Sequence, residues 1–98
     1  MSDHVFVVAH FTAKPGRASE LRSVIQSFVA PTRLEKGCIQ YDLCLDADNP
    51  EKFTFVEQWE SRADLDAHGK SAHITAGRQR LPDLVAEPAW VQVVRKIA

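Results

Sequence analysis

The sequence is poor in cysteine, with only two among its 98 residues. Cys38 and Cys44 lie in one predicted strand, and six residues of extended chain span about 20 Å. Cα atoms joined by a disulfide lie within about 7 Å of each other. The pair is therefore not a disulfide, and we interpret both cysteines as small buried residues of a protein from a reducing compartment.

Basic clusters and long apolar segments are also missing. The formal net charge is -1, the isoelectric point is near 6.4 and there is no run of Lys or Arg, which argues against nucleic acid as a partner. No apolar stretch approaches the roughly 20 residues of a membrane-spanning helix. Acidic Asp3, not a basic segment, precedes the first predicted strand. We expect a cytoplasmic protein that binds neither nucleic acid nor membranes.

Signatures of bound cofactors are lacking as well. The chain has no glycine-rich phosphate loop, no dinucleotide-binding fingerprint and no cysteine spacing of a zinc or iron–sulfur site. We therefore predict neither a cofactor nor a metal. A hydrophobic content of 45% suffices for one core, so residues 1–98 are predicted to form a single domain. A domain of this size that also holds a pocket has little apolar surface to spare for its core, which favours a homodimer.

Hydrophobic periodicity predicts the element order β-α-β-β-α-β. Pro31 is expected to end or kink the first helix near Ala30, and Gly69 to interrupt the second, with Ser61 and Ser71 capping its two pieces. The first strand is apolar on both faces and should be covered on both. The predicted strands cover residues 4–13, 38–46, 52–60 and 90–97, and the predicted helices cover residues 17–34 and 61–81.

This order is that of a ferredoxin-like α+β fold, in which an antiparallel sheet carries both helices on one face. Too few residues are left to cover the other face. We therefore expect a second copy to cover it, so that two sheets close into a dimeric α+β barrel. In the second strand, alternation places Ile39 and Tyr41 on one side and the two cysteines on the other.

His68 is the first candidate for chemistry. It follows Leu65 by three residues and precedes Ala72 by four, so the three share a helical face directed at the sheet. An imidazole titrates near neutral pH and can accept a proton from a phenol or an enol as a general base. The alternative is a buried histidine whose ring is satisfied by a backbone carbonyl.

A second group of candidates lies on the strand that leads to this helix. Glu57 and Trp59 share a strand face with Phe53 and Phe55. A carboxylate is costly to bury on an aromatic face, so Glu57 is either an acid or base with a raised pKa or half of an internal ion pair. Trp59 could stack on a flat substrate, and Tyr41 could hydrogen-bond an oxygenated ring. Plain core packing is the alternative for both.

Three further side chains are candidates for substrate binding. His73 lies five residues after His68, about 140° away around an ideal helix. This spacing makes the two a poor metal pair, and they share a face only if Gly69 breaks the helix. Arg78 could meet an anionic group or extend into water. His10 lies on the first strand, from which it could reach a pocket.

Four short motifs follow one another along the chain. They are Lys14-Pro15-Gly16 before the first helix, Glu35-Lys36-Gly37-Cys38 running into Tyr41, Asp48-Asn49-Pro50 before Phe53, and Glu57-Gln58-Trp59-Glu60-Ser61 followed by Leu65 and His68. Each motif is weak alone, but their order and spacing resemble the antibiotic biosynthesis monooxygenase domain family, most closely its small quinol-monooxygenase-like members. The resemblance covers about Val5 to Val94.

The resemblance implies a dimeric α+β barrel with one pocket per subunit, between helices and sheet. The family includes cofactor-free oxygenases of polycyclic phenols, quinol oxidases, haem-degrading enzymes and an isomerase of a phosphorylated sugar, so the fold leaves the reaction open. The Asn, Trp and His pattern of the haem-degrading members falls here on Ala9 or His10, on His68 and on Arg78. This mismatch argues against haem.

We therefore predict a cofactor-independent monooxygenase in which His68, supported by Glu57, deprotonates a quinol or polycyclic phenol that reacts directly with O2. The predicted substrate-binding residues are Trp59, Tyr41, His73, His10 and Arg78. Two alternatives stay open. One is an isomerase of a small oxygenated or phosphorylated metabolite held by Lys70 and Arg78, and the other is a dimer that binds small ligands without catalysis.

Overall fold

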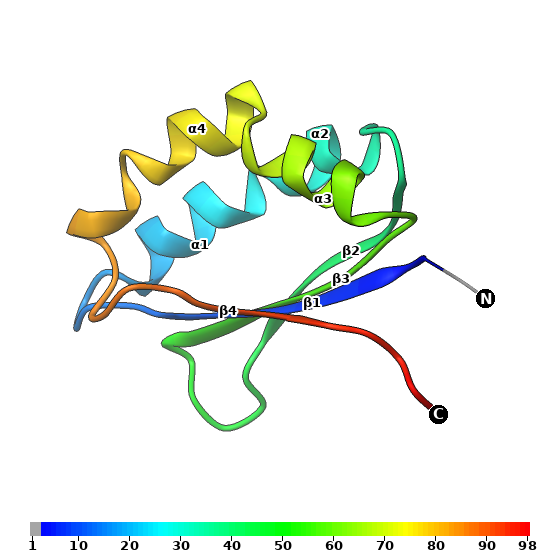
Figure 1. Cartoon of the computed structure of the whole chain (residues 1–98). Helices are drawn as coiled ribbons and strands as arrows, with labels where there is room; N and C mark the ends of the chain where they lie inside the picture. The colour runs from blue at the N-terminus through cyan, green and yellow to red at the C-terminus, as the bar shows by residue number, and fades with distance from the viewer. Residues whose placement is uncertain (1–2) are drawn as a thin grey trace.

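The computed structural model describes residues 3–98 and consists of one four-stranded sheet and a layer of short helices (Figure 1). The strands are β1 (Val5–Thr12), β2 (Cys38–Leu45), β3 (Lys52–Trp59) and β4 (Trp90–Val94). The helices are α1 (Ala18–Gln26), α2 (Val29–Arg33), α3 (Arg62–Gly69) and α4 (Ala72–Arg78), followed by the 3₁₀ turn η1 (Leu81–Asp83). Within residues 3–98, no helix is long and apolar enough to cross a bilayer.

The sheet is antiparallel throughout, with the strand order β2-β3-β1-β4. Glu57 of β3 is paired on one side with Val7 of β1 and on the other with Tyr41 of β2. The helices all lie on one face of this sheet (Figure 1). The structure therefore confirms the ferredoxin-like α+β fold predicted from the element order.

Side-chain alternation along β1 and β3 builds the core between the sheet and the helices. Every second residue of each strand is buried on the helical side. These residues are Val5, Val7, Ala9 and Phe11 of β1, with Phe53, Phe55, Glu57 and Trp59 of β3. The shared face predicted for Glu57 and Trp59 is confirmed.

The opposite face of the sheet is open in the single chain. Phe6 and Val8 are half-buried there, His10 is exposed, and Trp90 of β4 is 59% exposed. The prediction that β1 is covered on both faces is therefore not met by this chain alone, because its helices all lie on the other side (Figure 1).

A β-bulge changes the alternation of β2. The register shifts between Cys38 and Gln40, so Ile39 has no partner in β3. Cys38 thereby joins the face of Tyr41, and Ile39 is 46% exposed. The prediction that Ile39 packs beside Tyr41 is wrong for this reason. Cys44 is exposed, contrary to its predicted burial, and both cysteines are free thiols.

The first helical segment breaks earlier than predicted. The break comes at Ser27 and Phe28, not near Ala30, and Pro31 lies in the first turn of α2. A missing N–H costs no intrahelical hydrogen bond at that position. Gly77 of α4 lets the ring of Phe28 pack closely against that helix, because a Cβ at position 77 would overlap the ring.

The second helical segment is interrupted where the sequence predicts. Gly69 ends α3, and the Oγ of Ser61 caps its start by accepting a hydrogen bond from the backbone N–H of Asp64 at 3.1 Å. Ser71 precedes α4, but its hydroxyl donates to the carbonyl of His68 at 2.7 Å and does not cap the helix. Both α4 and β4 end sooner than predicted.

Candidate active site

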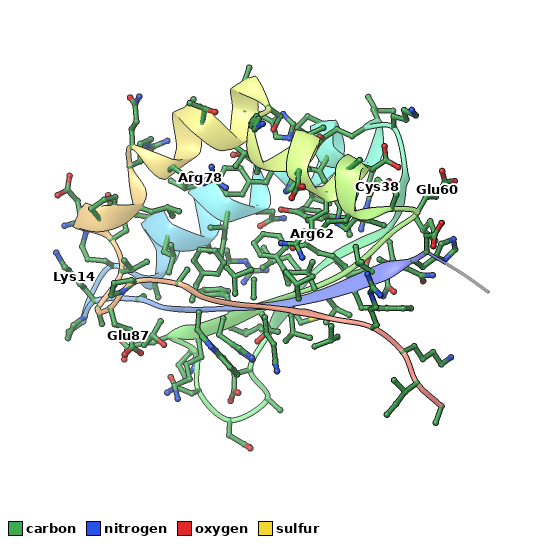
Figure 2. All side chains as sticks on the ribbon, viewed as in Figure 1. Lys14, Cys38, Glu60, Arg62, Arg78 and Glu87 are labelled. Atoms are coloured by element: carbon green, nitrogen blue, oxygen red, sulfur yellow. The ribbon has the colours of Figure 1, made fainter. Side chains whose placement is uncertain are left out.

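A cavity of about 590 Å³ lies between the sheet and helices α3 and α4. This volume is within the usual range of small-molecule sites. Its walls are mostly apolar, with side chains that include Phe11, Tyr41, Phe55, Ile74 and Val93. Charged side chains also border it, namely Arg62, Asp66, Lys70 and Arg78. Arg62 and Arg78 lie on the helical side of the sheet (Figure 2). Two buried ionisable residues, Glu57 and His68, also line the cavity.

Glu57 is 5% exposed and lies two residues before the end of β3. The indole Nε1–H of Trp59 donates a hydrogen bond to its Oε1 at 2.9 Å. Burial raises the pKa of this carboxyl to about 7, the hydrogen bond from Trp59 opposes that rise, and the charge of Glu35 adds to it. No salt bridge joins Glu57 to a cation within residues 3–98. Of the two predicted alternatives, the internal ion pair is not formed among these residues, and the raised pKa is present.

His68 lies in the last turn of α3 and is 7% exposed. Its ring packs against the rings of Trp59 and Tyr41, with centroids 4.8 Å and 5.4 Å away. Its Nδ1 lies 2.7 Å from Oε2 of Glu35. Burial lowers the pKa of the imidazole, and the hydrogen bond and charge of Glu35 oppose that shift.

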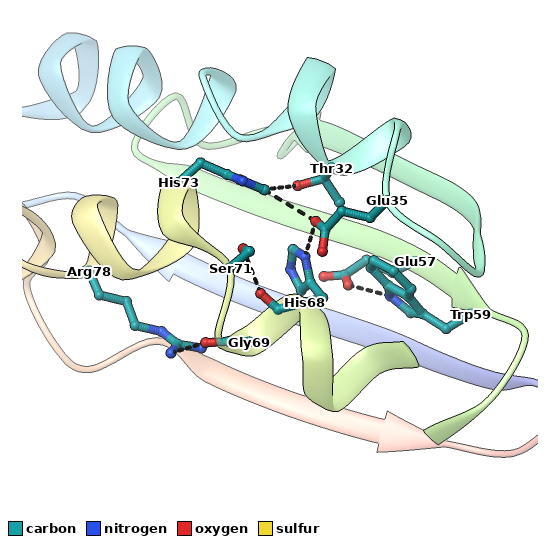
Figure 3. Close-up of polar contacts among 9 residues, drawn as sticks. All are labelled: Thr32, Glu35, Glu57, Trp59, His68, Gly69, Ser71, His73 and Arg78. Carbon is teal, nitrogen blue, oxygen red and sulfur yellow. Dashed lines mark hydrogen bonds and ion pairs between the residues drawn. The ribbon is translucent and has the colours of Figure 1, made fainter. Parts of the chain in front are cut away.

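Glu35 fixes the tautomer of His68. A carboxylate can only accept hydrogen bonds, so Nδ1 carries the hydrogen and Nε2 keeps a free lone pair. His68 lines the cavity and Glu35 does not, so the bond to Glu35 leaves the other ring nitrogen, Nε2, as the one that can serve a molecule in the cavity. In Figure 3, Glu35 reaches down to His68 from the turn after α2, while Glu57 is bonded to Trp59. The sequence predicted that Glu57 supports His68, but the hydrogen-bond partner of His68 in the structure is Glu35.

The site role of Glu35 was missed by sequence reasoning. The residue occurs in the motif Glu35-Lys36-Gly37-Cys38, but a charged residue before a glycine turn is normally solvated. Its contact with His68 joins residues 33 positions apart. Local periodicity cannot predict a contact between residues so far apart in the sequence.

The break after α3 brings His73 to the same place. Lys70 and Ser71 separate α3 from α4, so the two histidines no longer follow one helical spiral. Their ring centroids lie 6.2 Å apart. His73 Nε2 lies 3.2 Å from Oε2 of Glu35 and 2.9 Å from Oγ1 of Thr32 (Figure 3). The condition under which the two could share a face, a helix broken at Gly69, is met.

Tyr41, Arg78 and His10 differ in their relation to the cavity. Tyr41 is buried on its wall, where burial raises the pKa of its hydroxyl well above the usual value. Arg78 borders the cavity and donates from Nη1 to the carbonyl of Gly69 at 2.6 Å (Figure 3). His10 lies on the opposite face of the sheet, stacked on Trp90 with centroids 5.2 Å apart. The structure does not bring His10 to this site.

A family model described as antibiotic biosynthesis monooxygenase matches residues 4–80. Among curated proteins, one of Mycobacterium tuberculosis with the name "Putative monooxygenase Rv0793" is 37% identical over 94 residues, which make up 96% of this chain and 92% of that protein. The protein "Uncharacterized protein sll1783" of Synechocystis is 32% identical over 95% of this chain. The chain spans 63% of the length of that protein.

Solved structures agree with these sequence matches. PA3566 from Pseudomonas aeruginosa superposes with a TM-score of 0.93 at 32% identity and covers 100% of this chain and 98% of its own. The structure of Rv0793 superposes with a TM-score of 0.92 at 34% identity, covering 97% and 96% of the two chains.

Proposed function

The chain belongs to the antibiotic biosynthesis monooxygenase family, and from this premise we propose that it oxygenates a quinol or polycyclic phenol with O2. The observation that carries the proposal is the imidazole of His68 on the wall of an apolar cavity, with Glu35 bonded to its far edge. This arrangement supplies a base whose free nitrogen faces the substrate. The same division of roles, in which a carboxylate orients a histidine that moves protons, operates in hydrolytic triads.

The apolar cavity suits a flat, oxygenated ring system. Aromatic side chains of Tyr41, Phe55 and Phe11 line it, and face or edge contacts with rings favour an aromatic substrate. Trp59 is fully buried beneath His68 and acts through Glu57, to which its indole donates a hydrogen bond. Arg78 and Lys70 at the border are the groups that an acidic substituent of the substrate would meet.

The first half of the reaction forms a carbon–oxygen bond. His68 Nε2 takes a proton from the substrate, and the resulting anion is rich enough in electrons to reduce O2. Electron transfer and bond formation at carbon give a peroxide anion. Glu57, protonated in part near neutral pH because its pKa is about 7, donates the proton that turns this anion into a hydroperoxide.

The second half releases water. The Glu57 carboxylate removes the remaining hydrogen from the oxygenated carbon as a proton, the O–O bond breaks, and hydroxide leaves. The proton held by His68 converts the hydroxide to water. One oxygen atom stays in the product as a carbonyl, the other leaves in water with both substrate hydrogens, and the two side chains return to their starting states.

Oxygen uptake tests this proposal. The purified protein is supplied with a panel of anthrones and naphthalene diols, and we expect one O2 consumed per product, no hydrogen peroxide released and one ¹⁸O atom in the product from ¹⁸O2. Glu20→Gln, a surface variant in the Arg17–Glu20 pair, should consume oxygen at the rate of the unmodified protein. Absence of oxygen uptake with every member of the panel would refute the proposal, and turnover in strictly anaerobic buffer would favour isomerisation.

We also propose that two copies pair through the open face of the sheet. Phe6, Val8, Trp90 and Val94 lie on that face, and a second sheet laid over them removes apolar surface from water. Light scattering at micromolar concentration is expected to give about twice the chain mass of 11.0 kDa. Trp90→Glu places a charge in the pairing surface and should shift the mass toward one chain. A single-chain mass for the unmodified protein would contradict the pairing.

A further inference from the structure

Three side chains with metal-ligating atoms converge behind the wall of the cavity. His68 Nδ1 and His73 Nε2 lie 2.7 Å and 3.2 Å from one oxygen of Glu35. All three ligand atoms fall within 4.8 Å of one another. Across the part of the chain that the structure describes, this is the one such group of three histidine, cysteine or carboxylate side chains.

Two of the three separations are close to those that a metal ion imposes on its ligands. Zinc bonds of about 2.0–2.1 Å at tetrahedral angles hold neighbouring ligand atoms about 3.3 Å apart. The two contacts of Glu35 differ from that spacing by less than about 0.7 Å. The two imidazole nitrogens lie within 4.8 Å of each other, so side-chain rotations that bring them to a similar spacing would admit an ion between the carboxylate and the two imidazoles.

The three ligands are positioned before any ion arrives. Glu35 comes from the turn after α2, His68 from the end of α3 and His73 from the start of α4 (Figure 3). The ring of His68 is packed against Trp59, and Nε2 of His73 is held near Thr32 Oγ1. Because these side chains are already restrained, binding an ion costs little conformational entropy.

The ligand types select the class of ion. Two imidazoles and one carboxylate suit first-row divalent ions such as Zn²⁺ and Co²⁺, whereas Mg²⁺ and Ca²⁺ prefer oxygen ligands throughout. The three side chains are only 9%, 24% and 19% exposed for His68, His73 and Glu35. Such a position shields the ion from bulk water.

We propose that Glu35, His68 and His73 form a binding site for a divalent transition-metal ion, with Zn²⁺ as the ion that fits best. The site uses the nitrogen of His68 that contacts Glu35. A neutral imidazole carries a single N–H, which Glu35 now holds on Nδ1. An ion bound to Nδ1 needs the lone pair of that nitrogen, so the hydrogen must move to Nε2.

Metal binding at Nδ1 inactivates His68 as a base, a consequence that rests on the proposed function. With Glu35 as its partner, His68 presents a lone pair to the cavity; with a metal on Nδ1, it presents an N–H. The metal-loaded ring can donate a hydrogen bond to the substrate but cannot take its proton. Zn²⁺ is therefore an inhibitor of the oxygenation, and removal of the ion restores the base.

Cobalt titration tests the site without any assay of activity. Co²⁺ added to the chelator-treated protein is expected to bind one ion per chain, with the intense visible absorption of tetrahedral cobalt, and Zn²⁺ should displace it. His73→Ala and Glu35→Gln should each weaken binding by about 100-fold or more, since even the loss of an outer-shell partner costs 10- to 100-fold. His10→Ala, which changes a histidine on the other face of the sheet, should bind as the parent does. Absence of Co²⁺ binding, or equal binding by His73→Ala and the parent, would overturn the site.

Zinc inhibition tests the consequence separately. The ratio of oxygenation rates with and without Zn²⁺ is compared within each variant, so that differences in basal rate cancel. We expect the parent to be inhibited and then restored by chelator, and His73→Ala to need about 100-fold more Zn²⁺ for the same inhibition. Cobalt binding with no oxygenation would refute the proposed function and leave the metal site standing. Oxygenation that is unaffected by saturating Zn²⁺ would refute the inhibition.

Discussion

Replacing Glu57 with glutamine is expected to raise the free energy of unfolding by about 3 kcal/mol at pH 8, since each unit of pKa shift corresponds to about 1.4 kcal/mol. Burial raises the pKa of this carboxyl from 4.5 to about 7, so the folded state disfavours the charged form. The parent protein therefore loses stability as the pH rises from about 4.5 through about 7. Glutamine is uncharged over this range and loses nothing. Well below pH 4.5 the carboxyl is protonated in both states, and the two proteins should be equally stable.

Urea unfolding at pH 4 and pH 8, at one fixed protein concentration, measures this difference. Glu20→Gln is the control, because Glu20 is exposed and its surface pair with Arg17 contributes less than about 1 kcal/mol. A gain for Glu57→Gln that is the same at both pH values would contradict the reasoning, since the gain must come from a charge that forms only in the parent. No gain at pH 8 would show that the charged carboxylate is well accommodated in the fold.

The same substitution should reduce oxygenation, because the glutamine amide cannot donate a proton to the peroxide. Stability and activity are thus expected to move in opposite directions at one residue. A side chain that is kept at a cost to stability is characteristic of a functional site. Glu57 has that character here, since its hydrogen bond from Trp59 does not offset its burial.

The sequence predicted the parts of the site that depend on local periodicity. Alternation along 52–60 put Glu57 and Trp59 on one face, and the structure has them buried together and hydrogen-bonded. Helical spacing directed His68 at the sheet, where its ring packs on Tyr41 and Trp59. These inferences needed only the two-residue period of a strand and the roughly 3.6-residue period of a helix.

The features that the sequence did not predict depend on interruptions of those repeats or on long-range contacts. The bulge at Ile39 moves Cys38 to the face of Tyr41 and leaves Ile39 exposed, and the local alternation gives no sign of it. The partnership of Glu35 with His68 bridges distant segments. His10 was a candidate because it lies on the first strand, but its strand face directs it away from the cavity.

Removing the imidazole of His68 is expected to have the largest effect on catalysis. A general base contributes about 10²- to 10⁴-fold, so His68→Ala should lower kcat by that factor with a smaller change in KM. Glu35→Gln should cause a loss of comparable size, because a glutamine amide can donate to Nδ1 and so place the hydrogen on Nε2, the wrong tautomer for a base. Glu35 touches no substrate and is a positioning residue, so both variants are assayed with chelator present to exclude metal effects.

The double variant separates this mechanism from a merely structural role of Glu35. If Glu35 acts through His68, its loss has nothing further to remove once the imidazole is gone, so the double variant should be no slower than His68→Ala alone. Losses that multiply would mean that Glu35 acts independently of His68. A structural role predicts instead that Glu35→Gln lowers the free energy of unfolding and that the rate loss follows stability. We expect a change in kcat that exceeds any loss of folded protein, since the 2.7 Å contact of Glu35 with His68 orients the proton acceptor itself.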